Sequence, residues 1–248
     1  MPAAPLTMQV AGEGRPVLIL HGGGGPPTVL PISDHVAGHM RALTPTLPGW
    51  NGEPRPDAIA SVPDLAAACA AYLEQEDLTD VLVIGSSVGG WIASELAVND
   101  RDGRISGVVI LDGAGIDVEG EPMTDVFTLD PRGIAEKSFH DADRFYVDPA
   151  TQSPEERATF SANLDTLRAV AGDPYMHDPR LRERLRDVQV PVLVIWGDSD
   201  GIFTPAYGRA YAASFPNATF TLVKDAGHLP QLEQPAATMA LIDRFASS

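Results

Sequence analysis

Short apolar runs rich in β-branched residues alternate along the chain with segments whose apolar positions recur at helical spacing. Such runs are typical of strands buried on both faces of a parallel sheet. We predict five strands, at residues 16–22, 81–85, 105–113, 190–197 and 218–227. The helical spacing is clearest at residues 62–76, 87–98, 205–215 and 235–245. The alternation predicts an α/β fold with a mostly parallel central sheet flanked by helices.

Residues 116–187 interrupt this alternation of strand and helix patterns. The segment is rich in charge and proline, lacks a convincing buried strand and carries short helical patterns. One of them opens with Ser153, Pro154 and Glu156, which is a capping-box arrangement with proline at the first helical position. We therefore predict a helical cap at residues 116–187, inserted into a core formed by residues 1–115 and 188–248.

A Gly-x-Ser-x-Gly motif lies at the junction of a predicted strand and helix. Ser87 has Gly85 two positions before it and Gly89 two positions after it, whereas Ser86 has bulkier residues at both places. This pattern holds a nucleophilic serine on a sharp strand-to-helix turn, where the helix N-terminus favours developing negative charge. Taken alone, the pattern also fits a glycine-rich turn that packs closely or binds phosphate.

A serine nucleophile needs a base, and the base needs an acid that orients it. Two later predicted strands end in such residues: Asp198 and Asp200 follow one strand, and His228 follows the next. Ligands of open α/β sheets bind at this carboxyl edge of the strands. The resulting chain order is Ser, Asp, His.

With these motifs together, the sequence resembles the α/β-hydrolase-fold superfamily over nearly its whole length. The family's W-G-x-x-D segment matches residues 196–200, and its G-H-x-P-x-x-E-x-P segment matches residues 227–235. The resemblance implies an enzyme in which Ser87 is the nucleophile, Asp200 the acid and His228 the base.

Three other aspartates compete for the acid role. Asp198 lacks the motif spacing and fits a turn cap, and Asp225 fits a loop residue. Asp112 follows a predicted strand whose end supplies the acid in some relatives, so it stays open as an alternative. Besides His228, and His21 after the first strand, four histidines remain, and we expect them in surface or packing roles. We take no pair of these four to have zinc-ligand spacing. They are His35, His39, His140 and His177. We predict neither a metal nor a cofactor.

The loop after the first predicted strand carries four successive glycines after His21. Attack on a carbonyl leaves an oxyanion, which backbone N–H groups stabilise. The residue after the nucleophile, Val88, is expected to supply one donor. By resemblance to the family's H-G-x pattern, Gly23 supplies the other, with Gly24 in reserve, and His21 anchors the loop.

Composition limits the partners. The formal net charge of −17 disfavours nucleic acid and anionic membranes, which bind through clustered Lys and Arg. Cys69 is the single cysteine and lies in an alanine-rich helical pattern, so it is a poor nucleophile and no intrachain disulfide can form. We see no secretory signal pattern and no run long enough to span a bilayer, so we expect a cytoplasmic protein of undetermined oligomeric state.

The leading hypothesis is a serine hydrolase that cleaves a small to medium carboxylic ester of a small-molecule substrate. A carbon–carbon bond hydrolase or a cofactor-free perhydrolase with the same triad is the close alternative, and a small-molecule receptor with vestigial hydrolysis is another. A dinucleotide-binding enzyme is disfavoured because no G-x-G-x-x-G follows the first strand. Aromatic residues and Met of the cap region and elbow are expected mainly in packing, with some lining an apolar pocket. They are Trp91, Phe127, Phe139, Phe145, Tyr175 and Met176.

Overall fold

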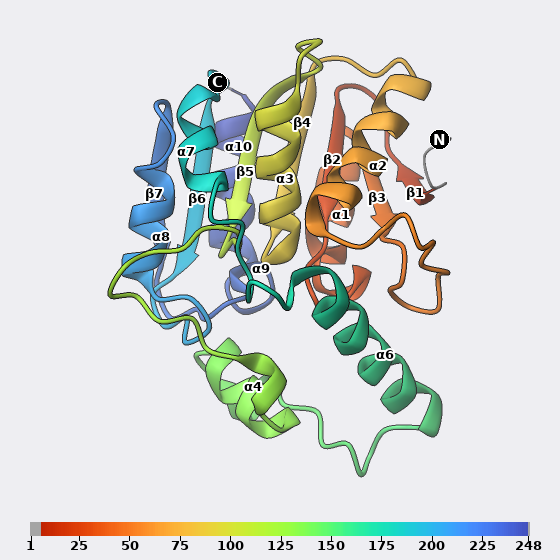
Figure 1. Cartoon of the computed structure of the whole chain (residues 1–248), viewed down its shortest axis with the longest axis vertical. Helices are drawn as coiled ribbons and strands as arrows, with labels where there is room; N and C mark the ends of the chain where they lie inside the picture. Colours follow the sequence, from red (N-terminus) through yellow and green to blue (C-terminus); the bar gives the residue numbers. More distant parts are fainter. Residues whose placement is uncertain (1–5, 248) are drawn as a thin grey trace.

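The computed structural model describes residues 6–247, and within them the chain forms a seven-stranded sheet of order β1-β3-β2-β4-β5-β6-β7 (Figure 1). β1 pairs antiparallel with β3, and every other neighbouring pair is parallel. The strands are β1 (Thr7–Ala11), β2 (Pro16–Leu20), β3 (Arg41–Thr46), β4 (Val81–Ser86), β5 (Ile105–Leu111), β6 (Val192–Gly197) and β7 (Ala218–Val223). The predicted fold class is confirmed.

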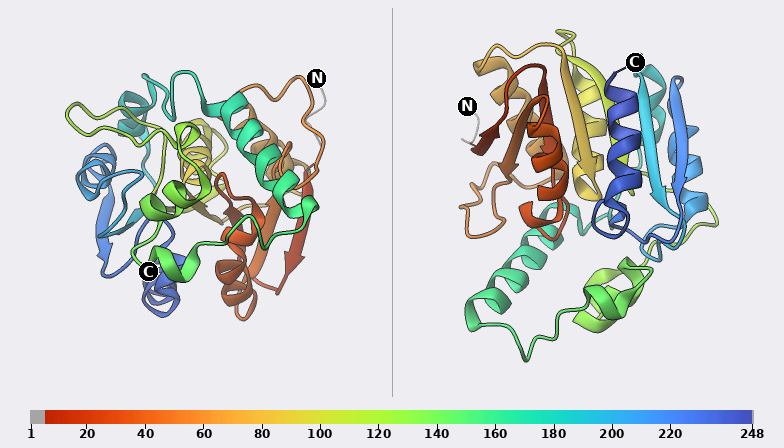
Figure 2. Two further views of the ribbon diagram at one scale, coloured as in Figure 1. Left: turned by 90° about the horizontal axis from the view of Figure 1, so that it is seen from below. Right: turned by 180° about the vertical axis from the view of Figure 1, so that it is seen from behind.

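Helices cover both faces of the sheet. α2 (Val62–Gln75), α3 (Val88–Asn99) and α8 (Pro205–Ala212) lie on one face. α1 (Leu30–Ala37) and α10 (Pro235–Ala246) lie on the other, as the view from behind shows (Figure 2). Because successive strand residues point to opposite faces, β4 contributes Val83 to the first core and Ile84 to the second. This explains why the strands read as continuous apolar runs rather than as alternating ones.

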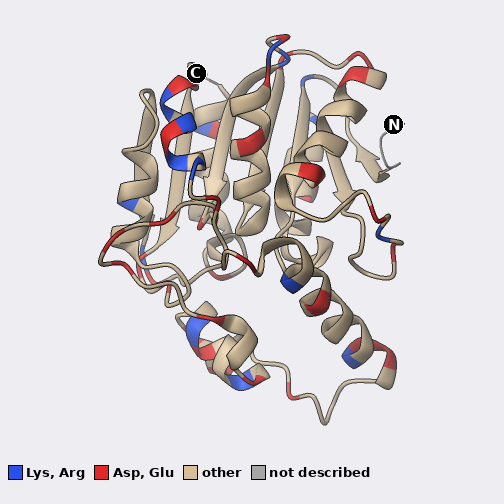
Figure 3. Cartoon of the chain, viewed as in Figure 1, with Lys and Arg blue, Asp and Glu red and all other residues tan. Residues whose placement is uncertain are grey.

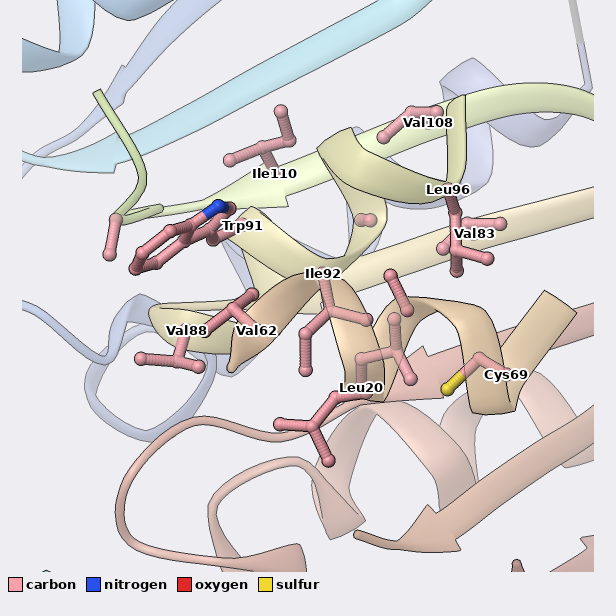
Figure 4. Close-up of a cluster of buried hydrophobic side chains, with 14 of the residues drawn as sticks. Leu20, Val62, Cys69, Val83, Val88, Trp91, Ile92, Leu96, Val108 and Ile110 are labelled. Carbon is pink, nitrogen blue, oxygen red and sulfur yellow. The ribbon is translucent and has the colours of Figure 1, made fainter. Parts of the chain in front are cut away.

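The core between α2, α3 and the sheet supports the strand-to-helix turn. Ile92 of α3 packs with Leu20 of β2 and Val62 of α2 in this cluster, close to Val88 at the start of α3 (Figure 4). Cys69 is fully buried in the same cluster, and burial raises the pKa of its thiol to about 12. The thiol is therefore neutral and enclosed, which agrees with the prediction that it is no nucleophile.

The segment between β5 and β6 leaves the sheet and carries several short helical elements and one long helix. They are the 3₁₀ turn Val126–Thr128, α4 (Pro131–Ser138), α5 (Ala142–Phe145), α6 (Pro154–Ala171), α7 (Leu181–Arg184) and the 3₁₀ turn Leu185–Asp187. α4 and α6 lie beyond the sheet edge at which the parallel strands end (Figure 1). The capping box of Ser153 and Glu156 is present at the start of α6, as predicted. α7 lies back beside the sheet, where Arg184 pairs with the buried Glu95 of α3 at 2.7 Å.

Two short helical elements complete the described chain: the 3₁₀ turn Pro26–Thr28 after β2, and α9 (Pro230–Glu233) before α10. The helix α1 was not among the clearest helix predictions. β1 and β3 were also not predicted. Acidic residues are spread over the loops and the helices (Figure 3). Among residues 6–247, none of the helices combines the length and apolarity needed to cross a membrane.

Candidate active site

The turn between β4 and α3 holds Ser87 in a backbone conformation that is unusual for a non-glycine residue, with φ 57° and ψ −121°. Two glycines make this turn possible. A Cβ on Gly85 would lie 2.1 Å from the carbonyl oxygen of Gly89, and a Cβ on Gly89 would lie 2.2 Å from that of Leu20. The Gly-x-Ser-x-Gly spacing is therefore a steric requirement of the turn.

Ser87, His228 and Asp200 meet at the carboxyl edge of the sheet. Ser87 Oγ lies 2.9 Å from His228 Nε2, and His228 Nδ1 lies 2.9 Å from Asp200 Oδ2. All three side chains are nearly fully buried. With the proton on Nδ1, the imidazole donates to Asp200 and its free Nε2 accepts from the Ser87 hydroxyl. The structure brings together the three residues that the sequence motifs indicated.

The carboxylate of Asp200 is held from its other side as well. Its Oδ1 accepts the backbone N–H groups of Ile202 at 2.7 Å and Phe203 at 3.2 Å. Two backbone donors on one oxygen leave Oδ2 free to face the imidazole. The loop that follows β6 thus fixes the orientation of the Asp200 carboxylate.

Asp112, the open alternative for the acid role, lies beside this pair without replacing it. Its Oδ1 accepts the backbone N–H of Gly197 at 2.9 Å, while its Oδ2 has no hydrogen-bonding partner other than the facing Asp200 carboxyl. Burial, followed by the negative charge of Asp200, raises the pKa of Asp112 well above its usual value. A neutral Asp112 can donate its proton toward Asp200 and support that carboxylate.

The glycine loop after β2 lies against Ser87. A Cβ on Gly22 would lie 2.7 Å from the Cβ of Ser87, so only glycine permits this approach. The indole of Trp50 donates to the carbonyl of Gly23 at 3.0 Å, and the Leu167 side chain of α6 lies directly over the same glycine. These two contacts hold the backbone at Gly23, which directly follows the glycine packed against Ser87. Among the described residues, no hydrogen bond engages the N–H of Gly23 or of Val88.

His21 anchors this loop, as predicted. Its Nδ1–H donates to the carbonyl of Gly22 at 2.8 Å, and its Nε2 accepts the backbone N–H of Leu47 at 3.1 Å. Complete burial lowers the pKa of His21 to about 4, so the ring stays neutral at physiological pH. A neutral ring is what this donor and acceptor pairing requires.

A cavity of about 170 Å³ opens above Ser87 and His228. Its walls come from the glycine loop, the loop before α4, α4, α6 and the segments around Met176, Ile202 and Leu229. The described side chains that line it include no Lys, Arg, Asp or Glu. A larger hollow of about 580 Å³ between α2 and α3 contains none of the triad residues, so volume alone does not locate the reactive site.

A second cavity of about 340 Å³ adjoins the first and is mostly apolar, although Arg157 and Gln152 also line it. Ile134, Phe139 and Phe160 line both, and Phe145, stacked on Phe139 at 4.9 Å between ring centroids, lines the outer one. Met176 also lines the inner cavity, whereas Trp91 is a buried core residue. Phe139, Phe145 and Met176 line the cavities, whereas Trp91, Phe127 and Tyr175 do not, so pocket walls take a larger share of these residues than the sequence suggested.

The other predicted alternatives lie outside the hydrogen-bonded triad. Asp198 is exposed and accepts from the Ser199 hydroxyl at 2.9 Å, and Asp225 is exposed in the turn after β7. His140 is exposed with its Nδ1 2.8 Å from Ser199 Oγ, and His177 Nδ1 donates to the carbonyl of Tyr175 at 2.9 Å. These residues have the turn, surface or packing roles that the sequence suggested.

Sequence reasoning missed the residues that hold the His228 loop in place. Glu233 is buried, and its carboxylate accepts the backbone N–H groups of Gly227 at 2.6 Å, His140 at 3.1 Å and Asp141 at 3.0 Å. Its place in the G-H-x-P-x-x-E-x-P segment was the available signal. Gln231 donates to the carbonyl of Thr28 and to Ser86 Oγ, tying α9 to the glycine loop and the elbow.

Fold and site together define a class of protein: an α/β protein with a hydrogen-bonded Ser-His-Asp chain at the carboxyl edge of its sheet, below helices. The model of the alpha/beta hydrolase family matches residues 17–241. The chain therefore belongs to this family and is a hydrolase.

Among curated relatives, a pimeloyl-(acyl-carrier protein) methyl ester esterase of Aromatoleum aromaticum is 29% identical, covering 92% of this chain and 97% of that protein. A putative non-heme bromoperoxidase of Mycobacterium tuberculosis is 28% identical, covering 95% of each chain.

Solved structures show the same fold. A thermophilic esterase from Thermogutta terrifontis superposes with a TM-score of 0.77 at 24% identity, covering 97% of this chain and 92% of that one. A meta-cleavage product hydrolase from Pseudomonas fluorescens superposes with a TM-score of 0.80 at 17% identity, covering 97% of this chain and 93% of that one.

Proposed function

We propose that the protein hydrolyses carboxylic esters of small to medium, uncharged acyl groups through an acyl-enzyme formed on Ser87. The observation that carries this proposal is the Ser87–His228–Asp200 hydrogen-bond chain at the floor of an apolar cavity. The curated esterase relative supports the same reaction class.

In the acylation step, Ser87 Oγ attacks the ester carbonyl while His228 Nε2 takes the hydroxyl proton. Asp200 keeps the ring in the Nδ1–H tautomer and stabilises the imidazolium that forms. The N–H groups of Gly23 and Val88 are the proposed oxyanion donors. His228 then gives its proton to the leaving alcohol, which departs and leaves the acyl group on Ser87.

Deacylation repeats these roles with water. His228 Nε2 takes a proton from a water molecule, and the hydroxide attacks the acyl carbonyl at the same oxyanion site. Collapse of the second tetrahedral intermediate returns the proton to Ser87 Oγ and releases the carboxylic acid. No metal or cofactor is needed for any of these steps.

The proposed cap, residues 116–187, sets the substrate range. Leu167 and Phe139 close the inner cavity, which is small, and the adjoining outer cavity extends the apolar path for a longer acyl chain. Because burying a carboxylate without a cation is costly, the lining of the inner cavity favours uncharged groups near the scissile bond.

That lining separates the ester hypothesis from the carbon–carbon hydrolase hypothesis. A vinylogous diketone acid carries a carboxylate, and the described side chains of the inner cavity offer it no Lys or Arg next to Ser87. The one cation of the outer cavity lining, Arg157, donates to the backbone carbonyls of Pro149 and Gln152. The bromoperoxidase relative keeps perhydrolysis as a second candidate, because peroxide can replace water in the deacylation step. A receptor with vestigial hydrolysis is disfavoured by the intact hydrogen bonds of the triad.

The test is pre-steady-state and steady-state kinetics on p-nitrophenyl esters of increasing acyl length. We expect a burst of p-nitrophenol followed by turnover, with an optimum among short to medium chains, and weak activity on diketone acids. Folded protein without burst or turnover at any length would reject ester hydrolysis. Faster attack on diketone acids would favour carbon–carbon cleavage.

A further inference from the structure

Two histidines and an aspartate converge on the face of the molecule covered by α1 and α10. His35 lies in α1, His39 follows two residues after the end of that helix, and Asp243 lies in α10. The two helices lie side by side in the view from behind (Figure 2). None of the three residues lines the cavity above Ser87, so this cluster is separate from the proposed active site.

The backbone places the two imidazoles one helical turn apart. The segment reads His35-Val36-Ala37-Gly38-His39, and the N–H groups of His39 and Met40 both bond to the carbonyl of Val36, so the helical path continues beyond α1. The ring centroids are 5.3 Å apart in an edge-to-face arrangement. Histidines at positions i and i+4 of a helical turn are a recurrent zinc-ligand spacing, which the sequence analysis overlooked.

The donor atoms are already close to a coordination geometry. His35 Nε2 lies 2.8 Å from Asp243 Oδ1, and His39 Nε2 lies 3.4 Å from the same oxygen. The three ligand atoms all lie within 4.8 Å of one another. A tetrahedral ion with bonds of about 2.0–2.1 Å needs ligand atoms about 3.4 Å apart. The first distance must widen by roughly half an ångström, which small torsions of these half-exposed side chains allow.

We propose that His35, His39 and Asp243 bind one divalent transition-metal ion, and that zinc suits the site best. Two imidazoles and a carboxylate are the donor set of zinc and its neighbours, whereas magnesium and calcium prefer oxygen ligands alone. Water completes the coordination at this open surface. The ion would bridge α1 and α10, two helices that are distant in sequence, and so stabilise the folded chain.

The charge balance supports the proposal. The formal net charge of −17 favours cation binding in general, but only the convergent imidazoles make the site selective for a transition metal. A plain His35–Asp243 ion pair is the competing interpretation, and it predicts no metal affinity.

Metal binding is measured by calorimetric titration of zinc into untagged protein that has first been stripped with a chelator. We expect saturable binding of one ion per chain and a rise in the unfolding temperature. Each of His35→Ala, His39→Ala and Asp243→Asn should weaken binding by on the order of tenfold or more. Cobalt binding should give a tetrahedral visible spectrum that the same substitutions abolish.

Two matched controls separate this site from nonspecific binding. Asp34→Asn removes an exposed carboxylate from the same helix, and His177→Ala removes an imidazole elsewhere; both should bind zinc like the parent. Asp243→Asn is nearly isosteric, so it tests the site even if a histidine variant folds poorly. Absence of saturable zinc binding, or binding that none of the three substitutions weakens, would overturn the proposal.

Discussion

The backbone N–H of His228 donates to the carbonyl of Ser138 at 2.7 Å, so the loop that carries the proposed base is bonded directly to the end of α4. The N–H of Gly201, next to Asp200, donates in the same way to the carbonyl of Lys137 at 2.9 Å. One end of the proposed cap is thus attached to both the base loop and the acid loop. Among the described residues, no hydrogen bond joins α6 to either of these loops, so the attachment runs through α4.

Glu233 reinforces this attachment, and we expect its loss to disturb both the loop that carries His228 and the segment that follows α4. Glu233→Ala leaves three backbone N–H groups, on both sides of the junction, without their acceptor. Unsatisfied buried donors cost about 1–3 kcal/mol each before water enters. We expect the free energy of unfolding to fall by about 2–4 kcal/mol and kcat/KM to fall by on the order of tenfold or more because His228 is mispositioned.

The matched variant is Glu233→Gln, which keeps one oxygen acceptor and should recover part of both losses. Urea unfolding and ester kinetics measured on the same preparations check the prediction. Full activity of the alanine variant, with stability alone reduced, would show that Glu233 does not position the base.

Asp112 should make the stability of the fold depend on pH. Its folded pKa is raised, so the unfolded chain loses this proton at lower pH than the folded chain does. Stability therefore falls as pH rises above about 3.9, and it continues to fall until the pH exceeds the raised folded pKa. Asp112→Asn keeps an oxygen for the N–H of Gly197 and removes the titration.

We expect the stability advantage of Asp112→Asn over the parent to grow from pH 5 toward pH 8, with activity largely retained. Chemical unfolding at several pH values measures the difference in stability between the two proteins, in which titrating groups distant from Asp112 cancel. Parallel stability curves for the two proteins would mean that Asp112 does not titrate as its burial indicates.

His21 should make the fold sensitive to acid. Its folded pKa of about 4 lies below the unfolded value of 6.5, so the unfolded chain takes up a proton first as pH falls. Stability due to this group is complete above 6.5 and is lost as pH falls toward 4, by about 3 kcal/mol in total. His21→Gln should lose this pH-dependent contribution, so its free energy of unfolding should change less with pH between 6.5 and 4 than that of the parent. Equal slopes for the two proteins would contradict the burial argument.

Acyl-chain selectivity should depend on Ile134, which lines both cavities. Ile134→Trp narrows the path between them, so kcat/KM for octanoyl esters should fall by on the order of tenfold relative to acetyl esters. Glu136→Trp, at an exposed position of the same helix, is the control and should leave the ratio unchanged. If the ratio of kcat/KM for octanoyl to acetyl esters is unchanged in the Ile134 variant, the acyl chain does not pass between these two cavities.

Buried parallel strands and their ends were predictable from sequence, because burial on both faces leaves an unbroken apolar run. β4 and β6 are fully buried along their lengths, and the residues that follow them are Ser87 and Asp198 to Asp200. β3 was missed because Pro45 and two threonines interrupt its apolar run. The parallel pairing of β3 with β2 ends at Leu43, and Pro45 pairs only with the edge strand β1.

Contacts between distant segments were not predictable from local pattern. His35 and Asp243 are separated by 208 positions, and the bond from Trp50 to Gly23 depends on how a loop folds over the sheet edge. The triad was an exception, because the strand-end rule and the family motifs together specified one shared edge. Glu233 was recognised only as a matching position of the family motif. Its structural role could not be predicted, because its three backbone partners lie in two different segments.

The most direct test of the proposed mechanism is reaction with a fluorophosphonate probe, followed by peptide mapping of the adduct. One adduct per chain on Ser87 is the expected result, with labelling abolished in Ser87→Ala and slowed by about 10⁴-fold or more in His228→Ala. A folded protein that stays unlabelled, or one that labels on Ser86 or another residue, would contradict a Ser87 nucleophile activated by His228.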